Sequence, residues 1–422
     1  MNLAPFRISI VVVSSLFFTQ VAHTIPTADK SEIVPVSRLL ANAAEIIKKH
    51  PNESYGYGIL GRTHSIAFTH GIWTSSRGPS LKAQWAHTAN EAGIKAPGTP
   101  EEVIKEGYRY NARILGHVPG AKLTSRQREH LEQSIRNYTI ATELSPSDYH
   151  CTLGLAWMLE QGTHYAKVLG SPWATGRDAK ISASPKEWQE RTLQAYRQAY
   201  VISAPTLDSD YNYEDLGEAA IGVLRLLSAP DRFKTPAEEA EIKVITARLK
   251  RLAKIPIFTS PIILPLGKST SLNDLLSKST SVTFDLAGNG LSRKWPWLSL
   301  DTGILVWDPE RKGNIRSGRQ LFGFATWWMF WKNGYEALAA LDNDENGALT
   351  GKELQGISIW RDANGNGVSD FGEVKPISDW GFTSLAVKAT NIVEGMPSNL
   401  NGAMKRNGTV VPTYDWTPRS LN

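Results

Sequence analysis

The 422-residue sequence contains a single cysteine, Cys151, so the chain can form no internal disulfide bond. It also lacks any long run of lysine or arginine, and its net charge of +5 is small for this length. Beyond the N-terminus, no segment approaches the roughly 20 apolar residues that a membrane-spanning helix needs. These absences argue against a disulfide scaffold, a nucleic-acid-binding protein and a polytopic membrane protein. Cys151 is expected to be a small buried hydrophobic residue.

The N-terminus carries a shorter apolar run with the layout of a secretory signal peptide. Arg7 precedes the run ISIVVVSSLFF, and small residues near Ala22 and Thr24 offer a cleavage site. We predict a signal peptide over residues 1–24, export to the periplasm or the extracellular space, and no membrane span after cleavage. An uncleaved N-terminal anchor is the alternative.

Three segments of residues 35–254 have the pattern of two helices joined at a proline. The prolines are Pro51, Pro146 and Pro205. Tyr138 and Tyr196 precede two of them, each followed by an alanine small enough to let two helices approach closely. The pattern resembles tetratricopeptide repeats (TPRs) separated by long insertions, and it predicts an all-α, TPR-like domain that binds a protein or peptide. A generic helical bundle is the alternative.

The composition changes after residue 254. The proline-rich stretch IPIFTSPIILPLGKSTS lacks helical periodicity, so residues 255–280 are predicted to be an extended linker. Strand patterns in SVTFDL, WPWLSL and GILVWD and a helical pattern in FGFATWWMFWKNGYEALAAL follow. They predict a small mixed α/β domain over residues 281–392, with a C-terminal tail over residues 393–422. We expect its tryptophans to lie in the core, with a carbohydrate or membrane-interface platform as the alternative. The tryptophans of the helical pattern are Trp327, Trp328 and Trp331.

Residues 342–353, DNDENGALTGKE, match the twelve-residue loop of an EF-hand at every constrained position. Calcium takes six to eight oxygen ligands, and such a loop supplies them from alternate residues. Gly347 makes the sharp turn at position 6, and Glu353 is the bidentate carboxylate at position 12. The predicted ligands of this first loop are Asp342, Asp344, Asn346, the carbonyl of Ala348, Thr350 and Glu353.

Residues 362–373, DANGNGVSDFGE, fill the same positions and form a second loop. Its predicted ligands are Asp362, Asn364, Asn366, the carbonyl of Val368, Asp370 and Glu373. Ser369 replaces the usual aliphatic residue at position 8, which would weaken a strand contact between the loops. Two polar turns are the alternative for both loops, but turn chemistry does not account for a glutamate at position 12 in each. We therefore predict two bound calcium ions.

The loops begin only twenty positions apart, and residues 354–361 between them form at most about two helical turns. An ordinary EF-hand pair needs two helices in this place. The sequence GISIWRD instead alternates Ile357 and Ile359 as a strand does, and FTSLAVKA shows a further strand pattern. We predict helix–loop–helix for the first loop and strand–loop–helix for the second.

The segment from FDLAGNG through LVWDPERKGNIRSGRQLFG to DWGFTSLAV resembles bacterial exported domains with repeated calcium loops. Such domains occur in calcium-binding secreted proteins and in uncharacterised proteins that join them to helical repeats. The resemblance covers about residues 281–390 and implies calcium binding and export, without a known activity. It also implies earlier loops at Asp285 and Asp308. Ala287 and Lys312 occupy ligand positions there, and an ammonium repels calcium, so only the later two sites are carried over.

Motifs for catalysis are scarce. The sequence contains no HExxH, no GxSxG and no phosphate-binding glycine loop, and the helical spacing of Glu160 and His164 is typical of a surface contact. We predict an α+β multidomain protein without enzymatic activity, in which calcium is mainly structural because the compressed loops leave little room for helix opening. The alternatives are a calcium-responsive sensor or regulator and an uncharacterised enzyme with calcium as a structural ion.

Overall fold

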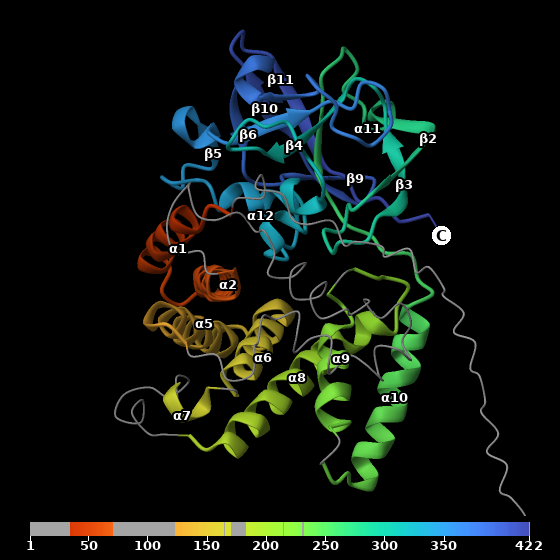
Figure 1. Ribbon diagram of the computed structural model, residues 1–422. Coiled ribbons are helices and arrows are strands. Elements are labelled where there is room, and N and C mark those ends of the chain that lie inside the picture. The colour runs from red at the N-terminus through yellow and green to blue at the C-terminus, as the bar shows by residue number, and fades with distance from the viewer. Residues whose placement is uncertain are drawn as a thin grey trace, which may run out of the picture.

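The computed structural model describes residues 34–70, 123–163, 165–169, 183–213, 215–229 and 232–421. The predicted signal peptide and most of the insertions between the helical units lie outside these residues. A helical half, residues 34–254, lies against a β-rich sheet half, residues 255–421 (Figure 1). An N-terminal helical region followed by an antiparallel sheet confirms the α+β multidomain prediction. Within the described residues, no helix combines the length and apolar character required to cross a membrane.

Successive helices of the helical half pack against one another in chain order. Their bounds are α1 (Val36–Lys49), α2 (Ser54–His70), α5 (Ser125–Leu144), α6 (Tyr149–Thr163), α7 (Ala166–Leu169), α8 (Pro185–Leu207), α9 (Glu218–Leu227) and α10 (Pro236–Leu252). The helices α1 and α5 end two residues before a proline, as predicted, whereas α8 continues through Pro205 for two further residues. Side-chain caps fix the starts of α5, α8 and α10.

Aromatic residues fill the grooves between these helices where glycines allow close approach. A Cβ atom added at Gly154 of α6 would lie 2.3 Å from the ring of Tyr138, and one added at Gly222 of α9 would lie 2.3 Å from the ring of Tyr196. Both contacts are too short for any side chain at the glycine positions. Tyr138 and Tyr196 thus pack closely against glycines of the following helices, whereas the prediction had named the alanines after each tyrosine as the small residues.

A buried ion pair joins three helices. Arg225 of α9 donates two hydrogen bonds to the carboxylate of Glu160 on α6, and the Tyr196 hydroxyl of α8 donates to the same carboxylate at 2.6 Å. The prediction that Glu160 makes a surface contact is therefore wrong, because α8 and α9 cover this face of α6. His164, which shares its helical spacing, lies outside the described residues.

Within residues 255–421, nine strands form one sheet in the order β5–β8–β10–β11–β1–β4–β6–β7, with β9 paired to β10. Its strands are β1 (Ile262–Pro265), β4 (Thr302–Trp307), β5 (Ala348–Thr350), β6 (Ile357–Trp360), β7 (Val374–Pro376), β8 (Phe382–Ala386), β9 (Asn391–Val393), β10 (Met396–Lys405) and β11 (Val410–Asp415). The paired strands within it are antiparallel. A separate hairpin consists of β2 (Leu276–Phe284) and β3 (Arg293–Leu298).

The predicted linker and tail both belong to the sheet half. In place of an extended linker over residues 255–280, β1 lies between β11 and β4, the short helix α11 (Leu272–Leu275) follows, and β2 begins. Residues 393–422 do not form a tail, because they contribute β10 and β11. Every residue of β1 is buried, so this strand lacks the polar alternation by which a half-exposed strand is recognised.

The predicted helical block after residue 321 is helical only in α12 (Gly334–Ala339) and in one 3-10 turn, η3 (Thr326–Trp328). Before η3 the chain runs along the start of β1: the Ile262 amide donates to the Phe322 carbonyl at 2.6 Å, and the Phe324 amide donates to the Ser260 carbonyl at 3.1 Å. These bonds divert the backbone from a helix. Trp327 and Trp331 are buried, which confirms the core prediction for them, while Trp328 is partly exposed.

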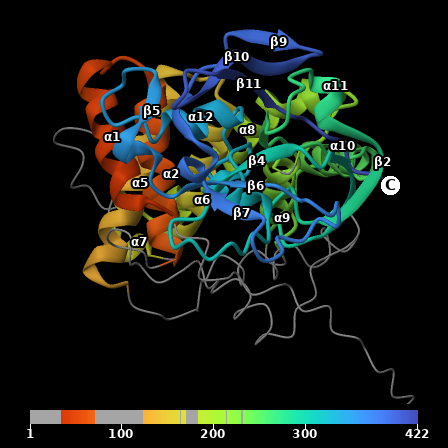
Figure 2. The same ribbon diagram turned by 90° about the horizontal axis from the view of Figure 1, so that it is seen from above.

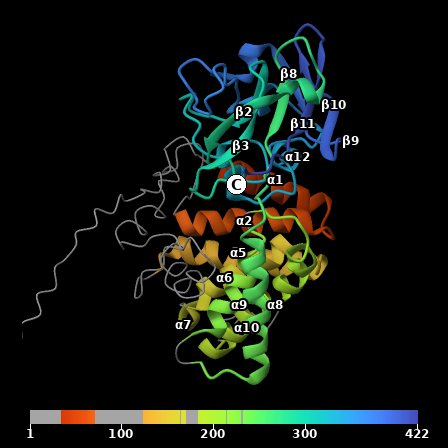
Figure 3. The same cartoon turned by 90° about the vertical axis from the view of Figure 1, so that its right-hand side faces the viewer.

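One apolar core contains residues of both halves. It combines Leu39 and Ala43 of α1 and Ile59 of α2 with residues of the sheet half such as Trp331 and Leu338. The helices α1 and α2 accordingly lie between the sheet half and the other helices (Figure 3). Seen from above, β5 and the loop before it overlie α1 (Figure 2). The helices α1 and α2 therefore form the part of the helical half that packs against the sheet half.

Candidate metal centre

The first and second loops share one internal hydrogen-bond pattern, beginning with the aspartate at position 1. The backbone amides of positions 5 and 6 donate to its two carboxylate oxygens. The distances are 3.2 and 2.9 Å at Asp342 and 3.2 and 2.7 Å at Asp362. Both aspartates are buried. The amides therefore fix each carboxylate within its loop.

The glutamate at position 12 is fixed in the same way. It accepts from the backbone amides of positions 2 and 9, at 2.7 and 3.0 Å in Glu353 and at 2.8 and 3.1 Å in Glu373. The side-chain oxygens at positions 3 and 5 also accept from the amide two residues further along, in both loops. The loop backbone thus orients the side chains of four predicted ligands, at positions 1, 3, 5 and 12.

Three carboxylates meet in the first loop. Ligand oxygens of Asp342, Asp344 and Glu353 all lie within 4.8 Å of one another. Burial, together with the neighbouring Asp344 and Glu353 carboxylates, raises the pKa of Asp342 above its ordinary value. The raised pKa means that the ionised carboxylate of Asp342 is unfavourable in these surroundings, and a bound cation would stabilise it. Carboxylate, amide and carbonyl oxygens without histidine or cysteine suit a hard cation such as calcium.

In the second loop, the third carboxylate lies apart from the other two. Asp370 is exposed, and its carboxylate accepts hydrogen bonds from the side-chain amides of Asn364 at 2.8 Å and Asn366 at 2.9 Å. These hydrogen bonds lower the pKa of Asp370. At the equivalent position 9 of the first loop, Thr350 lies in β5 beside Ala348, another predicted ligand. Position 7 of the second loop, Val368, also carries an exposed side chain.

The elements around the loops agree only in part with prediction. The first loop follows α12 and continues into a 3-10 helix, η4 (Gly351–Leu354), which is a short helix–loop–helix. The second loop follows β6, as predicted, but leads into β7 rather than a helix. Because β6 and β7 pair with each other, this loop is the connection of a β-hairpin, and the helical turn η5 (Ile377–Trp380) comes only after β7.

The two earlier loops have the same backbone shape. In all four loops the residues at positions 4 and 6 have positive φ angles. These residues are Gly288 and Gly290, Arg311 and Gly313, Glu345 and Gly347, and Gly365 and Gly367. Arg311 and Glu345 adopt this conformation although a side chain makes it unfavourable. The positive φ angles at positions 4 and 6 therefore recur in loops whose ligand pattern is incomplete.

Cationic side chains of the protein itself accompany the earlier two aspartates. Lys312 forms an ion pair with Glu310 in the loop of Asp308. Burial raises the pKa of Asp285, and the positive charge of Arg319 opposes this rise. The Arg319 guanidinium also donates to the Gly288 carbonyl at 2.5 Å within the same loop. We assign no metal to these loops.

The first and second loops do not pair with each other through position 8. Leu349 of the first loop pairs with Leu385 of β8. Ser369 of the second loop instead accepts a hydrogen bond at 2.8 Å from the amide of Ile315, which is position 8 of the Asp308 loop. The strand contact that Ser369 was expected to weaken is therefore not formed between the two ligand-bearing loops.

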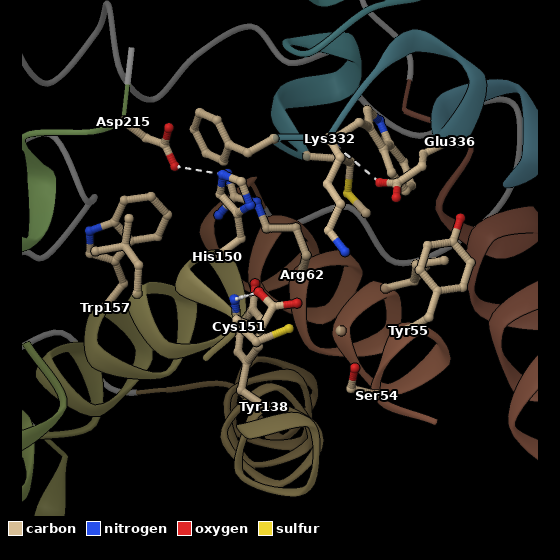
Figure 4. A pocket seen from close by; sticks show the side chains of 17 residues that line it. Ser54, Tyr55, Arg62, Tyr138, His150, Cys151, Trp157, Asp215, Lys332 and Glu336 are labelled. Carbon is tan, nitrogen blue, oxygen red and sulfur yellow. Dashed lines mark hydrogen bonds and ion pairs between the residues drawn. The ribbon is translucent and has the colours of Figure 1, made fainter. Parts of the chain in front are cut away.

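A pocket of about 90 Å³ lies between the two halves (Figure 4). Arg62 lies over the rings of Trp157 and Phe330, and His150 Nε2 lies 3.2 Å from Asp215 Oδ2. Cys151 also lines the pocket, but its thiol points away from the His150–Asp215 pair (Figure 4). Burial raises the pKa of this thiol, which opposes a nucleophilic thiolate. The cysteine is buried, as predicted.

Comparisons with known proteins relate part of the chain to one domain family and to one curated protein. Residues 270–413, about a third of the chain, match the family model described as SPM domain. The iron-regulated protein FrpA of Neisseria meningitidis serogroup C is 34% identical to this chain over 107 residues, which are 24% of this chain and 10% of that protein. The chain spans about a tenth of the length of that relative. The stretch that matches the SPM domain contains the first and second loops and none of the helical half.

Proposed function

We propose that this exported protein binds two calcium ions, one in the first loop and one in the second, and that the ions are mainly structural. The observation that carries the proposal is the hydrogen-bond pattern common to both loops. Backbone amides of the same loop orient the carboxylates at positions 1 and 12, and fixed ligands lose less conformational entropy on binding. The oxygen-only ligand set favours calcium over transition metals.

The helical half is proposed to be a TPR-like array that binds a protein or peptide. Its helices pack in chain order, and glycine–tyrosine contacts set their spacing. Stacked helix pairs of this kind form extended surfaces for polypeptide ligands. Export is supported by the signal-peptide pattern of residues 1–24.

Isothermal titration with calcium tests the proposal. The wild-type protein is expected to bind two ions, Glu353→Gln and Glu373→Gln one each, and the double variant none. Each substitution removes the charge of a bidentate ligand, for which we expect an affinity loss on the order of 100-fold. Glu310→Gln, in the loop of Asp308, is the matched control and should retain two ions. Unchanged calcium affinity in the double variant would overturn the assignment.

The structural role is tested on the same proteins. Calcium at about 100 times its dissociation constant should stabilise the fold by about 2.7 kcal/mol for each site. Binding of an apolar dye should stay constant, because a structural ion exposes no groove. Dye binding that rises with calcium would instead establish a sensor.

A further inference from the structure

The first loop is in direct contact with α1 of the helical half. Arg38 Nε donates to the Asn343 side-chain oxygen at 2.8 Å, and its guanidinium also donates to the carbonyls of Leu341 and Glu353. Asn42 Nδ2 donates to the Ala340 carbonyl at 2.9 Å and to the same Asn343 oxygen at 3.1 Å. The helix α1 therefore forms hydrogen bonds with both the beginning and the end of the loop.

A salt bridge extends the contact. Lys49 Nζ lies 3.0 Å from Glu345 Oε1, at position 4 of the loop. Both partners are at least partly exposed, so this pair contributes little by itself. Asn42, by contrast, is buried, and Arg38 is half-buried. Arg38 and Asn42, being less exposed, therefore contribute more to the contact than the salt bridge does.

Asn343 connects this contact to a predicted ligand. Its side-chain oxygen accepts from Arg38 and Asn42, while its backbone amide donates to Glu353 Oε1 at 2.7 Å. Arg38 donates to the backbone carbonyl of Glu353 and not to its carboxylate. The ligand oxygens therefore stay available to an ion while the backbone that carries them is held by α1.

The second loop lacks this connection. Ala363 occupies position 2, and its amide donates to Glu373 Oε1 at 2.8 Å, as Asn343 does in the first loop. An alanine side chain cannot accept a hydrogen bond, however, so nothing links position 2 to a neighbouring element in this way. Position 2, which is not a ligand position, thus links the first loop to α1 and makes no such link in the second.

We propose that calcium binding at the first loop is coupled to the docking of the helical half through Asn343, with Arg38 and Asn42 as positioning residues. The coupling rests on the proposed calcium function. It is reciprocal: α1 strengthens binding at the first loop, and calcium at the first loop strengthens the docking of α1. A partner bound to the helical half and calcium bound to the sheet half would therefore influence each other.

The test measures each loop separately in the full-length protein. Glu373→Gln leaves only the first loop to bind calcium, and Glu353→Gln leaves only the second. In the first background, Asn343→Ala should lower calcium affinity about 10- to 100-fold, the range for residues that orient ligands. In the second background it should change affinity by less than about twofold. Asn343→Asp keeps an accepting oxygen, but its added negative charge would raise calcium affinity by itself, so this variant is compared by hydrogen exchange in α1.

Hydrogen exchange supplies a second readout, which a purely local effect would not move. Calcium should slow amide exchange in α1 of the Glu373→Gln protein and leave it unchanged when Asn343→Ala is added. The coupling would be overturned if Asn343→Ala left the calcium affinity of the Glu373→Gln protein unchanged. It would also be overturned if Asn343→Ala lowered calcium affinity equally at both loops. If the Glu373→Gln protein binds no calcium while retaining its fold, the proposed function of the first loop fails instead.

Discussion

The first and second loops have one backbone shape and one internal hydrogen-bond pattern, but different parts of the molecule support them. The first loop lies between α12 and η4 and is held by α1, from the other half. The second closes the β6–β7 hairpin, and it lies against β2 and β3. There, Trp297 Nε1 donates to Asp362 Oδ2 at 2.7 Å, and Val282 packs against Gly367.

The two loops share a shape although different elements surround them. The shape of a loop and its attachment to the rest of the protein therefore depend on different residues. The shape depends on backbone amides that donate to side chains of the same twelve residues, so it recurs in both loops. The support is tertiary: a guanidinium donates to the backbone carbonyls of Leu341 and Glu353 at the first loop, and a neutral indole donates to a carboxylate of the second. Variants that change one support should therefore affect one loop and leave the other unchanged.

The largest expected effect concerns Asp415, which holds the helix before the first loop. The buried Asp415 carboxylate accepts from the Gly334 amide at 3.0 Å, where α12 begins. Burial raises its pKa from 3.8 to about 7. Because the folded state binds the proton more tightly, stability is fully present below about pH 4 and is lost as the pH rises through 7. The loss is on the order of 4 kcal/mol for a pKa that rises from 3.8 to about 7.

Asp415→Asn removes this titration, so its free energy of unfolding should depend less on pH than that of the wild type. Urea unfolding at pH 5 and pH 8 without calcium measures the difference. Asp379→Asn, at an exposed position of η5, is the control and should keep the wild-type pH dependence. A wild-type pH dependence in Asp415→Asn would show that this carboxyl is ionised throughout.

The glycines at position 6 provide the next test. Both have positive φ, 91° at Gly347 and 72° at Gly367. An added Cβ would meet nothing within 4 Å at Gly347, but would lie 2.7 Å from the Val282 Cβ at Gly367. Gly347→Ala should therefore cost about 1–2 kcal/mol of backbone strain. Gly367→Ala should cost about 2–4 kcal/mol, because overpacking adds to the strain.

Urea unfolding of both variants without calcium measures these costs. A double-mutant cycle with Val282→Ala isolates the steric part. The valine substitution should recover about 1 kcal/mol or more of the loss in Gly367→Ala, and none of the loss in Gly347→Ala. Equal costs at the two glycines would mean that β2 does not confine the second loop.

Local features of the molecule could be predicted from the sequence. The loop shape follows from residues spaced within twelve positions, and β6 and β8 follow from apolar alternation in ISIW and FTSLA. Tyr138 and Tyr196 were recognised because helix packing needs a bulky residue beside small ones. Each of these signals lies within a short window of the chain.

Features that depend on distant segments could not be predicted. The strand β1 was predicted to be linker because it is short, lacks polar alternation and lies in a proline-rich stretch; its pairing with β4 and β11 is what makes it a strand. The contact of Arg38 with Asn343 spans 305 positions, and neither residue belongs to the ligand pattern. Arg38 and Asp415, which support the first loop, were therefore both missed. Asp415 in addition lay in a segment predicted to be a tail.

The smallest expected effect is at position 9, where the loops differ in charge. The exposed Asp370 carboxylate interacts with the amides of Asn364 and Asn366 and would reach an ion only through water. In the Glu353→Gln background, Asp370→Asn should lower calcium affinity at the second loop by about 3- to 10-fold, because it removes a nearby negative charge. High salt should reduce the effect.

The matched substitution is Thr350→Asp at position 9 of the first loop, measured by calorimetry in the Glu373→Gln background. An added carboxylate should raise affinity there by a similar factor. The free energy of unfolding without calcium should change little in Asp370→Asn, because the side chain is exposed. If Asp370→Asn instead weakens binding as severely as Glu373→Gln does, the carboxylate at position 9 contacts the ion directly. The second loop would then coordinate calcium differently from the first, despite their common backbone.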